Sequence, residues 1–340
     1  MHETPPPAFW TPVVLNLAGA APSLDWGDLR GVRFAEPFFQ QTVERWAGGA
    51  PAPLIRTGLG ALATFDAAPS LDPDLLVFHA SRCGSTLLSR LLGTVPGVLV
   101  VAEPPPLNAL LLAAPAEGDD PEAVRMVRRL VRALGQRRFG DERHFVLKLS
   151  SWNVRRIELF RRAFPAAAVI WLQRDPTAIA MSLLADPPGW LARGRPDWAP
   201  SVFGRETGAD GDAAFCVRAL AAMLAAATEI AGRTLFLDYA ELPAAVWQRV
   251  APFLGIALTE ADVACMRREA GFYAKDPGRR PFTGDDPARP MLSSGLRALL
   301  AEQAEPLYRG LDRRRQGLAP PDLPISNGGS RCFRDDGALG

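Results

Sequence analysis

The chain has 340 residues, of which 48% are hydrophobic, and its formal net charge at pH 7 is +1. This length is enough to bury a sizeable core as one large domain or two small ones, and the hydrophobic content excludes a chain that is disordered throughout. Because acidic and basic residues balance, the composition excludes a strongly basic surface, and we expect no nucleic-acid partner.

The first 70 residues contain no phosphate-binding pattern. Proline runs at 5–7 and 51–53 interrupt them, and Glu36–Trp46 has the apolar spacing of a helix with one buried face. We predict an N-terminal accessory segment over residues 1–70. It either packs on the core or presents a surface to a partner.

The N-terminus lacks the basic and apolar regions of a secretion signal, and the longest apolar stretch, Ala219–Ala227, is too short to span a bilayer. The four cysteines show neither zinc-ligand spacing nor a disulfide framework. We therefore expect a reduced, cytoplasmic protein with no membrane span and no metal site. The sequence leaves the oligomeric state open.

From residue 71 onward, short apolar runs alternate with helical patterns. This alternation predicts an α/β fold in which a central parallel sheet of about five strands has helices on both faces and binds ligands at the carboxyl ends of its strands. The predicted strands are 75–78, 98–101, 145–149, 168–172 and 234–237, and the predicted helices are 85–93, 121–138, 153–163, 176–184 and 213–231. We predict one domain over 71–318 and a mobile tail over 319–340.

One long irregular segment interrupts this alternation at residues 185–212. It is rich in Pro, Gly, Trp and Arg, and a loop of this length inside a compact domain is typical of a lid or a binding loop. Its aromatic residues Trp190, Trp198 and Phe203 would give a binding site an apolar rim, although core packing would explain them equally well.

The stretch 75–92 carries the clearest functional pattern. An apolar strand is followed by a turn of small residues and by a helix that starts at Ser85. Backbone N–H groups at such a helix start form a phosphate cradle, and Gly84 lets the backbone approach the ligand closely. A nucleoside-triphosphatase P-loop has a lysine where Ser85 stands. The cation here is Arg82, which can bind two anionic oxygens at the mouth of the loop. The predicted phosphate-binding residues are Ser81, Arg82, Cys83, Gly84, Ser85, Thr86 and Leu87.

Two later strand ends carry cations. Arg174 follows the strand 168–172, and the next helix carries Ser182, so both side chains can hold one phosphate in the same crevice. Lys148, one of only two lysines, ends the strand 145–149. A buried ammonium group is costly, so we expect Lys148 to pair with an anion unless it reaches solvent at the sheet edge.

These motifs resemble those of bacterial-type sulfotransferases that use 3′-phosphoadenosine 5′-phosphosulfate (PAPS). Residues Ser81–Leu88 resemble the family's 5′-phosphosulfate loop, and Arg174 and Ser182 keep the eight-residue separation of its 3′-phosphate motif. The resemblance implies a P-loop fold, PAPS as co-substrate, and transfer of a sulfuryl group to a hydroxyl or amine of a small-molecule or peptide acceptor. It also implies that Lys148 polarises the transferred group.

Two fainter segments extend the resemblance. Tyr239 is similar to the tyrosine that lies beside the nucleotide in the family. The basic loop that starts at Lys275 resembles a loop that closes over the 3′-phosphate, with Arg279 and Arg280 as its candidate ligands.

Sulfuryl transfer also needs a general base, which contributes roughly 10²–10⁴-fold to the rate. Many cytosolic sulfotransferases carry a histidine two residues after the strand-end lysine, but here that position is Ser150. Glu103 follows the strand 98–101 and resembles the glutamate base of tyrosylprotein and some bacterial glycolipid sulfotransferases. His79 is the second candidate. We predict Glu103 as the base, with Lys148 and Arg82 as the other catalytic residues.

Two other functions are compatible with the sequence. A Mg²⁺-dependent nucleotide phosphotransferase would hold its metal through Thr86 and Asp238, with Asp238 ending an apolar strand as a Walker-B carboxylate does. A non-catalytic P-loop protein would instead use residues 1–70 to bind a partner.

Overall fold

The computed structural model describes residues 6–17, 21–48, 53–115, 120–191, 202–203, 211–284 and 291–318. Most of the predicted lid, including Trp198, and the predicted tail from residue 319 lie outside these ranges. None of the helices in the described ranges is long and apolar enough to cross a membrane.

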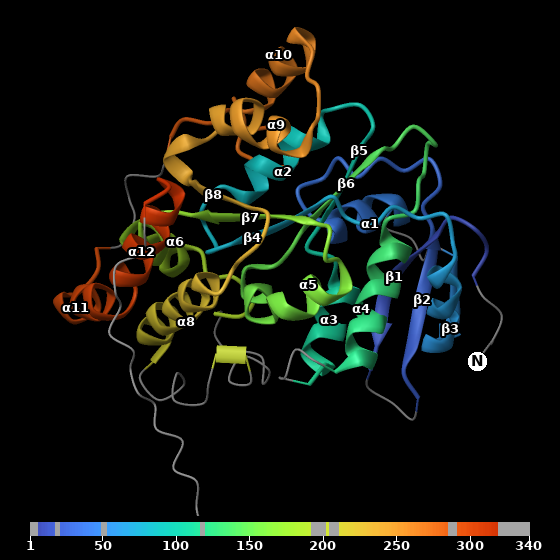
Figure 1. The fold of residues 1–340 in the computed structure, drawn as a ribbon, viewed down its shortest axis with the longest axis horizontal. Helices are drawn as coiled ribbons and strands as arrows, with labels where there is room; N and C mark the ends of the chain where they lie inside the picture. Colours follow the sequence, from blue (N-terminus) through green and yellow to red (C-terminus); the bar gives the residue numbers. More distant parts are fainter. Residues whose placement is uncertain are drawn as a thin grey trace, which may run out of the picture.

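A five-stranded parallel sheet forms the centre of the molecule (Figure 1). Its strands are β4 (Leu75–His79), β5 (Val98–Ala102), β6 (His144–Lys148), β7 (Ala168–Gln173) and β8 (Thr234–Asp238), in the order β5-β6-β4-β7-β8. Each strand lies within one residue of its predicted bounds, because each is a short apolar run, and all but the edge strand β8 are largely buried on both faces. The predicted α/β class is confirmed.

The two faces of the sheet are covered by different helices, which gives three layers. Leu75 and Val77 point to the face covered by α2 (Ser85–Gly93), α9 (Ala251–Leu254) and α10 (Glu260–Glu269). Leu76 and Phe78 point to the opposite face, as the period-two alternation of a strand requires. That face is covered by α3 (Pro105–Ala113), α4 (Pro121–Leu134), α5 (Ile157–Ala163), α6 (Pro176–Ala185), α8 (Gly211–Thr228), α11 (Ser294–Gln303) and α12 (Glu305–Arg315).

The N-terminal segment forms a second, antiparallel sheet that the sequence analysis did not predict. Its strands are β1 (Trp10–Asn16), β2 (Ser23–Asp28) and β3 (Leu54–Gly58). Leu24, Trp26 and Phe39 of this segment belong to the same hydrophobic cluster as the side chains on the Leu76 face of the central sheet. Figure 1 shows the three strands beside α3 and α4. The segment therefore packs on the core.

The helix predicted over Glu36–Trp46 begins later, as α1 (Phe39–Ala47). Pro37 accounts for the exclusion of Glu36, because a proline disfavours the helical conformation of the residue before it. Phe38 precedes the helix with an extended backbone.

Candidate active site

A large cavity of about 1190 Å³ opens at the carboxyl ends of the central strands. All seven residues of the predicted phosphate loop, Ser81 to Leu87, line it. Arg174, Ser182 and Tyr239 line it as well, and so does Glu103. The segments that the sequence marked as functional therefore meet in one place, although the strands that carry them are far apart in the chain.

The loop between β4 and α2 has an unusual backbone conformation. The φ angles of Ser81, Arg82 and Gly84 are +66°, +45° and +85°. A side chain at position 84 would also clash, because its Cβ would lie 2.6 Å from Leu242 Cδ1 and 2.9 Å from Tyr239 Cδ2. Glycine is thus required at 84 both by its backbone angle and by the close approach of the β8 side of the cavity.

Helix α2 begins directly after Gly84 without a capping side chain. The first intrahelical bond runs from the Leu88 amide to the Gly84 carbonyl, so the amides of Ser85, Thr86 and Leu87 have no acceptor within the helix. These amides and the helix dipole favour an anion at this end of the cavity. The Cys83 thiol donates to the Leu172 carbonyl (3.2 Å), and burial raises its pKa to about 12, so it is a small packing group and not a nucleophile.

His79 fixes the start of this loop. Its Nδ1 accepts a hydrogen bond from the Ser81 amide (3.1 Å), so its proton is on Nε2, which donates to the Leu149 carbonyl (2.9 Å). Burial, followed by the charge of Lys148, lowers the pKa of His79 to about 3. The imidazole is neutral and its lone pair is already used. The structure therefore argues against His79 as the general base and gives it a positioning role.

Arg82 extends from the loop to the mouth of the cavity. Its guanidinium donates to the Asp186 carboxylate (2.7 Å) and to the Asp186 carbonyl. The Arg82 side chain is 12% exposed and that of Asp186 is 78% exposed, so the ion pair sits at the rim. The predicted cation is in place, but a surface carboxylate engages it.

Arg174 follows β7, and its guanidinium carbon lies 4.1 Å from the centre of the Tyr239 ring. Its Nη1 also donates to the Arg82 carbonyl (3.4 Å), which joins the two predicted phosphate motifs directly. Asp175 caps helix α6 by accepting from the Ala178 amide (2.8 Å), and this places Ser182 two turns into the helix at the cavity wall.

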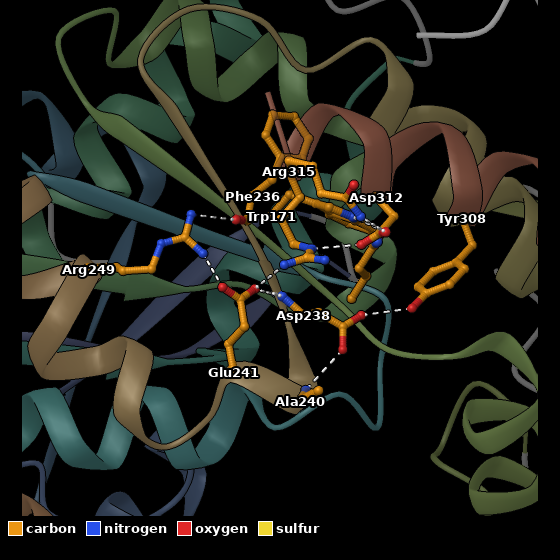
Figure 2. Close-up of polar contacts among 11 residues, drawn as sticks. Trp171, Phe236, Asp238, Ala240, Glu241, Arg249, Tyr308, Asp312 and Arg315 are labelled. Carbon is orange, nitrogen blue, oxygen red and sulfur yellow. Dashed lines mark hydrogen bonds and ion pairs between the residues drawn. The ribbon is translucent and has the colours of Figure 1, made fainter. Parts of the chain in front are cut away.

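The turn that carries Tyr239 is held by a polar network (Figure 2). Asp238 accepts from the Ala240 amide (2.9 Å) and from the Tyr308 hydroxyl (3.0 Å). Glu241 accepts from the Asp238 amide (2.8 Å) and pairs with Arg249 and Arg315. Both carboxylates are engaged in structural contacts, and neither lines the cavity. The Asp238 carboxylate is thus not placed to serve the Walker-B role of the phosphotransferase alternative.

Glu103 follows the edge strand β5 in a left-handed conformation, with a φ angle of +51°. The ammonium group of Lys148 donates to its Oε1, and the Ser150 hydroxyl donates to its Oε2 (3.2 Å). The charge of Lys148 opposes the effect of burial, and the pKa of Glu103 is lowered from its usual value. The carboxylate is ionised at neutral pH and faces the cavity.

Lys148 is placed differently from the prediction. Its side chain is fully buried, it does not line the cavity, and its Nζ lies 5.1 Å from the centre of the Phe38 ring. A desolvated ammonium group requires an anion, and Glu103 at the end of the neighbouring strand supplies it. The expected ion pair exists, but Lys148 lies behind Glu103 and does not face the space where a ligand would bind.

The two arginines predicted in the basic loop lie in different places. Arg280 lines the cavity and stacks on Tyr273, with 4.2 Å from its guanidinium carbon to the ring centre. Arg279 turns away and pairs with Glu269 (2.7 Å) beside a separate cavity of about 190 Å³. The loop instead contributes Lys275 to the large cavity, a residue that the sequence analysis assigned no role. The rarity of lysine in this chain was the signal that could have identified it.

Comparison with known proteins gives one family. The sequence model described as the sulfotransferase family matches residues 73–260, and no curated protein matches the chain. A sulfotransferase structure from Alicyclobacillus acidocaldarius is 17% identical, and the match covers 72% of this chain and 96% of that chain at a TM-score of 0.41. Sulfotransferase STF9 from Mycobacterium avium is 19% identical, with 76% and 80% covered and a TM-score of 0.40. Mouse sulfotransferase SULT7A1, complexed with PAP, is 14% identical, with 74% and 86% covered and a TM-score of 0.37.

Proposed function

This chain belongs to the sulfotransferase family, and we propose that it transfers a sulfuryl group from PAPS to a hydroxyl or amine of a small-molecule or peptide acceptor. One observation carries the proposal. The phosphate loop with its positive φ angles, the pair Arg174 and Ser182, and the ionised Glu103 all line one cavity. The proposed reaction uses no metal ion.

The phosphate end of this cavity is defined by Ser81–Leu87, Arg174 and Ser182. The amides of Ser85–Leu87 and the guanidinium of Arg82 would bind the 5′-phosphosulfate, since they are fixed hydrogen-bond donors at a helix start. Arg174 and Ser182 would bind the 3′-phosphate, with help from Arg280. The Tyr239 ring would hold the Arg174 guanidinium in place for this contact.

The reacting end is defined by Glu103 and the residues around it. In the proposed step, Glu103 accepts the proton of the acceptor hydroxyl while the acceptor oxygen forms a bond to sulfur. The bond between sulfur and the bridging oxygen of the 5′-phosphate breaks, and its electron pair leaves with PAP. Lys148 would keep Glu103 ionised and oriented.

The size of the cavity leaves space for an acceptor beside the nucleotide. Ligand pockets for one drug-sized molecule measure about 300–1,000 Å³, and this cavity exceeds that range. Phe38, Trp152 and Trp190 line it together with Glu103. We expect an acceptor with an aromatic or apolar body next to its reacting hydroxyl.

The test is isothermal titration of the protein with adenosine 3′,5′-bisphosphate (PAP) in the presence of a metal chelator, compared with ATP plus Mg²⁺. We expect PAP to bind without metal and ATP to bind much more weakly. Magnesium-dependent ATP binding in the absence of PAP binding would refute the proposal. A screen of hydroxyl and amine acceptors with PAPS then identifies the second substrate.

A further inference from the structure

Both cations that the sequence suggested for the reacting end, Arg82 and Lys148, are paired with carboxylates. Lys148 is fully buried, and its charge is balanced by Glu103. Arg82 is held at the rim by Asp186. Sulfuryl transfer places negative charge on the sulfuryl oxygens and on the leaving phosphate, and such charge requires a fixed positive group in the site. This requirement directs attention to the other cations that line the cavity.

Lys275 lines the cavity and makes no side-chain hydrogen bond or ion pair with any residue in the described ranges. The charged groups with the largest effects on the pKa of Lys275 are Arg82, Lys148, Glu103 and Asp186. Lys275 in turn acts on both Glu103 and His79. Lys275 also lines the same cavity as Glu103, His79 and Ser81, so it shares this space with the proposed base and with the start of the phosphate loop.

The loop that carries Lys275 is anchored to the helix of the phosphate cradle. Arg90, on α2, donates to the Ala274 carbonyl (3.1 Å) and pairs with Glu269 at the end of α10. The Tyr273 amide donates to the Arg280 carbonyl (2.9 Å), which closes the base of the loop. The side chains of Arg90 and Glu269 are each only 10% exposed, so this anchor is shielded from water. The anchor therefore fixes the position of the Lys275 loop relative to α2.

We propose that Lys275 is a catalytic residue whose ammonium group contacts the sulfuryl group during transfer, in the place that the sequence gave to Lys148. This inference rests on the proposed function. A lysine suits the task, because its compact ammonium carries three donors and no partner has to be displaced. Desolvation by the cavity wall, followed by the charge of Arg82, lowers the pKa of Lys275 to about 8, so an added anion is favourable for it.

The contact can be tested without knowing the acceptor, because PAPS and PAP differ by the sulfuryl group. We would titrate wild type, Lys275→Met and Arg280→Met with both nucleotides and measure any PAP released from PAPS during the titration. A charge-assisted hydrogen bond lost at the sulfuryl group would weaken PAPS binding by about 10- to 100-fold. We expect Lys275→Met to show this loss for PAPS and little change for PAP.

Arg280→Met is the matched control from the same loop, because its proposed ligand, the 3′-phosphate, is present in both nucleotides. It should weaken PAPS and PAP equally. If Lys275→Met weakens both nucleotides equally, or neither, Lys275 does not contact the sulfuryl group and the inference is overturned. If wild type binds neither nucleotide, the proposed function itself fails, and the inference fails with it.

Discussion

The two ends of the cavity are built in different ways. The phosphate end depends mainly on backbone conformation within one short segment, Ser81–Leu87, and on donors that are fixed before a ligand arrives. The reacting end is assembled from three distant segments that carry Glu103, Lys148 and Lys275, and the charges of Lys148 and Lys275 both lower the pKa of Glu103. A site fixed by geometry should lose affinity when it is altered, whereas a site fixed by mutual charge should lose rate and change its pH dependence.

Glu103→Gln should have the largest effect, and this effect should be on the reaction rate and not on nucleotide affinity. Removing the base should lower kcat by about 10²–10⁴-fold, while PAP affinity stays within a few fold. The measurement is PAP release from PAPS with a panel of hydroxyl and amine acceptors, alongside PAP titration. An unchanged kcat would remove Glu103 from the proposed mechanism.

The same substitution leaves the buried ammonium of Lys148 without its anion, so loss of stability has to be separated from loss of chemistry. The double variant Glu103→Gln/Lys148→Met removes both charges. We expect it to have a higher Tm than Glu103→Gln and to remain equally inactive. Recovery of activity in the double variant would show that the single variant was only destabilised.

Arg174→Met should affect the phosphate end alone. Loss of a charge-assisted contact to the 3′-phosphate should weaken PAP and PAPS binding alike, by about 10- to 100-fold, with kcat at saturating PAPS within a few fold of wild type. The control is Arg268→Met, because Arg268 is exposed on α10 and does not line the cavity. This variant should bind both nucleotides with wild-type affinity. A loss of affinity for PAPS but not for PAP would place Arg174 at the reacting end and would contradict the separation of the two ends.

The sequence predicted most of the central sheet because its strands are short apolar runs between turns. The N-terminal sheet escaped prediction because Pro12 and Gly27 interrupt its strands and Asp25, although 5% exposed, is charged. Asp25 is buried against Arg56, which pairs with it from β3 at 2.6 Å. A partner 31 residues away in the sequence determines the environment of this side chain, and a local sequence pattern cannot reveal it.

The two ends of the cavity also differed in how well their geometry could be predicted. The loop at Ser81–Leu87 and the pair Arg174 and Ser182 were expected in one crevice, and they line one cavity. Their positions follow from strand ends and helix starts, which are local features. Lys148 was expected to face the ligand, but the direction of a strand-end side chain depends on which carboxylate can reach it. The position of Lys275 in the cavity depends on how a loop far along the chain packs on α2.

Lys148→Met should change the pH dependence more than the maximal rate. Lys148 is the main charge that lowers the pKa of Glu103, so its removal should raise that pKa. The base is active only when ionised, and the acidic limb of the kcat/KM profile should therefore move to higher pH. Lys275→Met removes a weaker influence on Glu103 and should move the limb less, in the same direction. If neither variant moves the limb, Glu103 is not the titrating group.

The smallest expected effect concerns the alkaline limb. Because Lys275 has a pKa of about 8, its ammonium is lost as the pH rises through that value, and kcat/KM for PAPS should fall above pH 8. Arg82, Lys148, Glu103 and Asp186 face Lys275 from other segments, and Asp276 and Arg280 flank it on its own loop. Arginine keeps its charge well above this range.

Lys275→Arg should therefore retain activity to higher pH, whereas Lys275→Met should show a low rate without this limb. The pH profile of kcat/KM for PAPS in the three proteins decides the matter. An alkaline limb near pH 8 that persists in Lys275→Met would assign it to another group. The reacting end would then depend on Glu103 and Lys148 without Lys275.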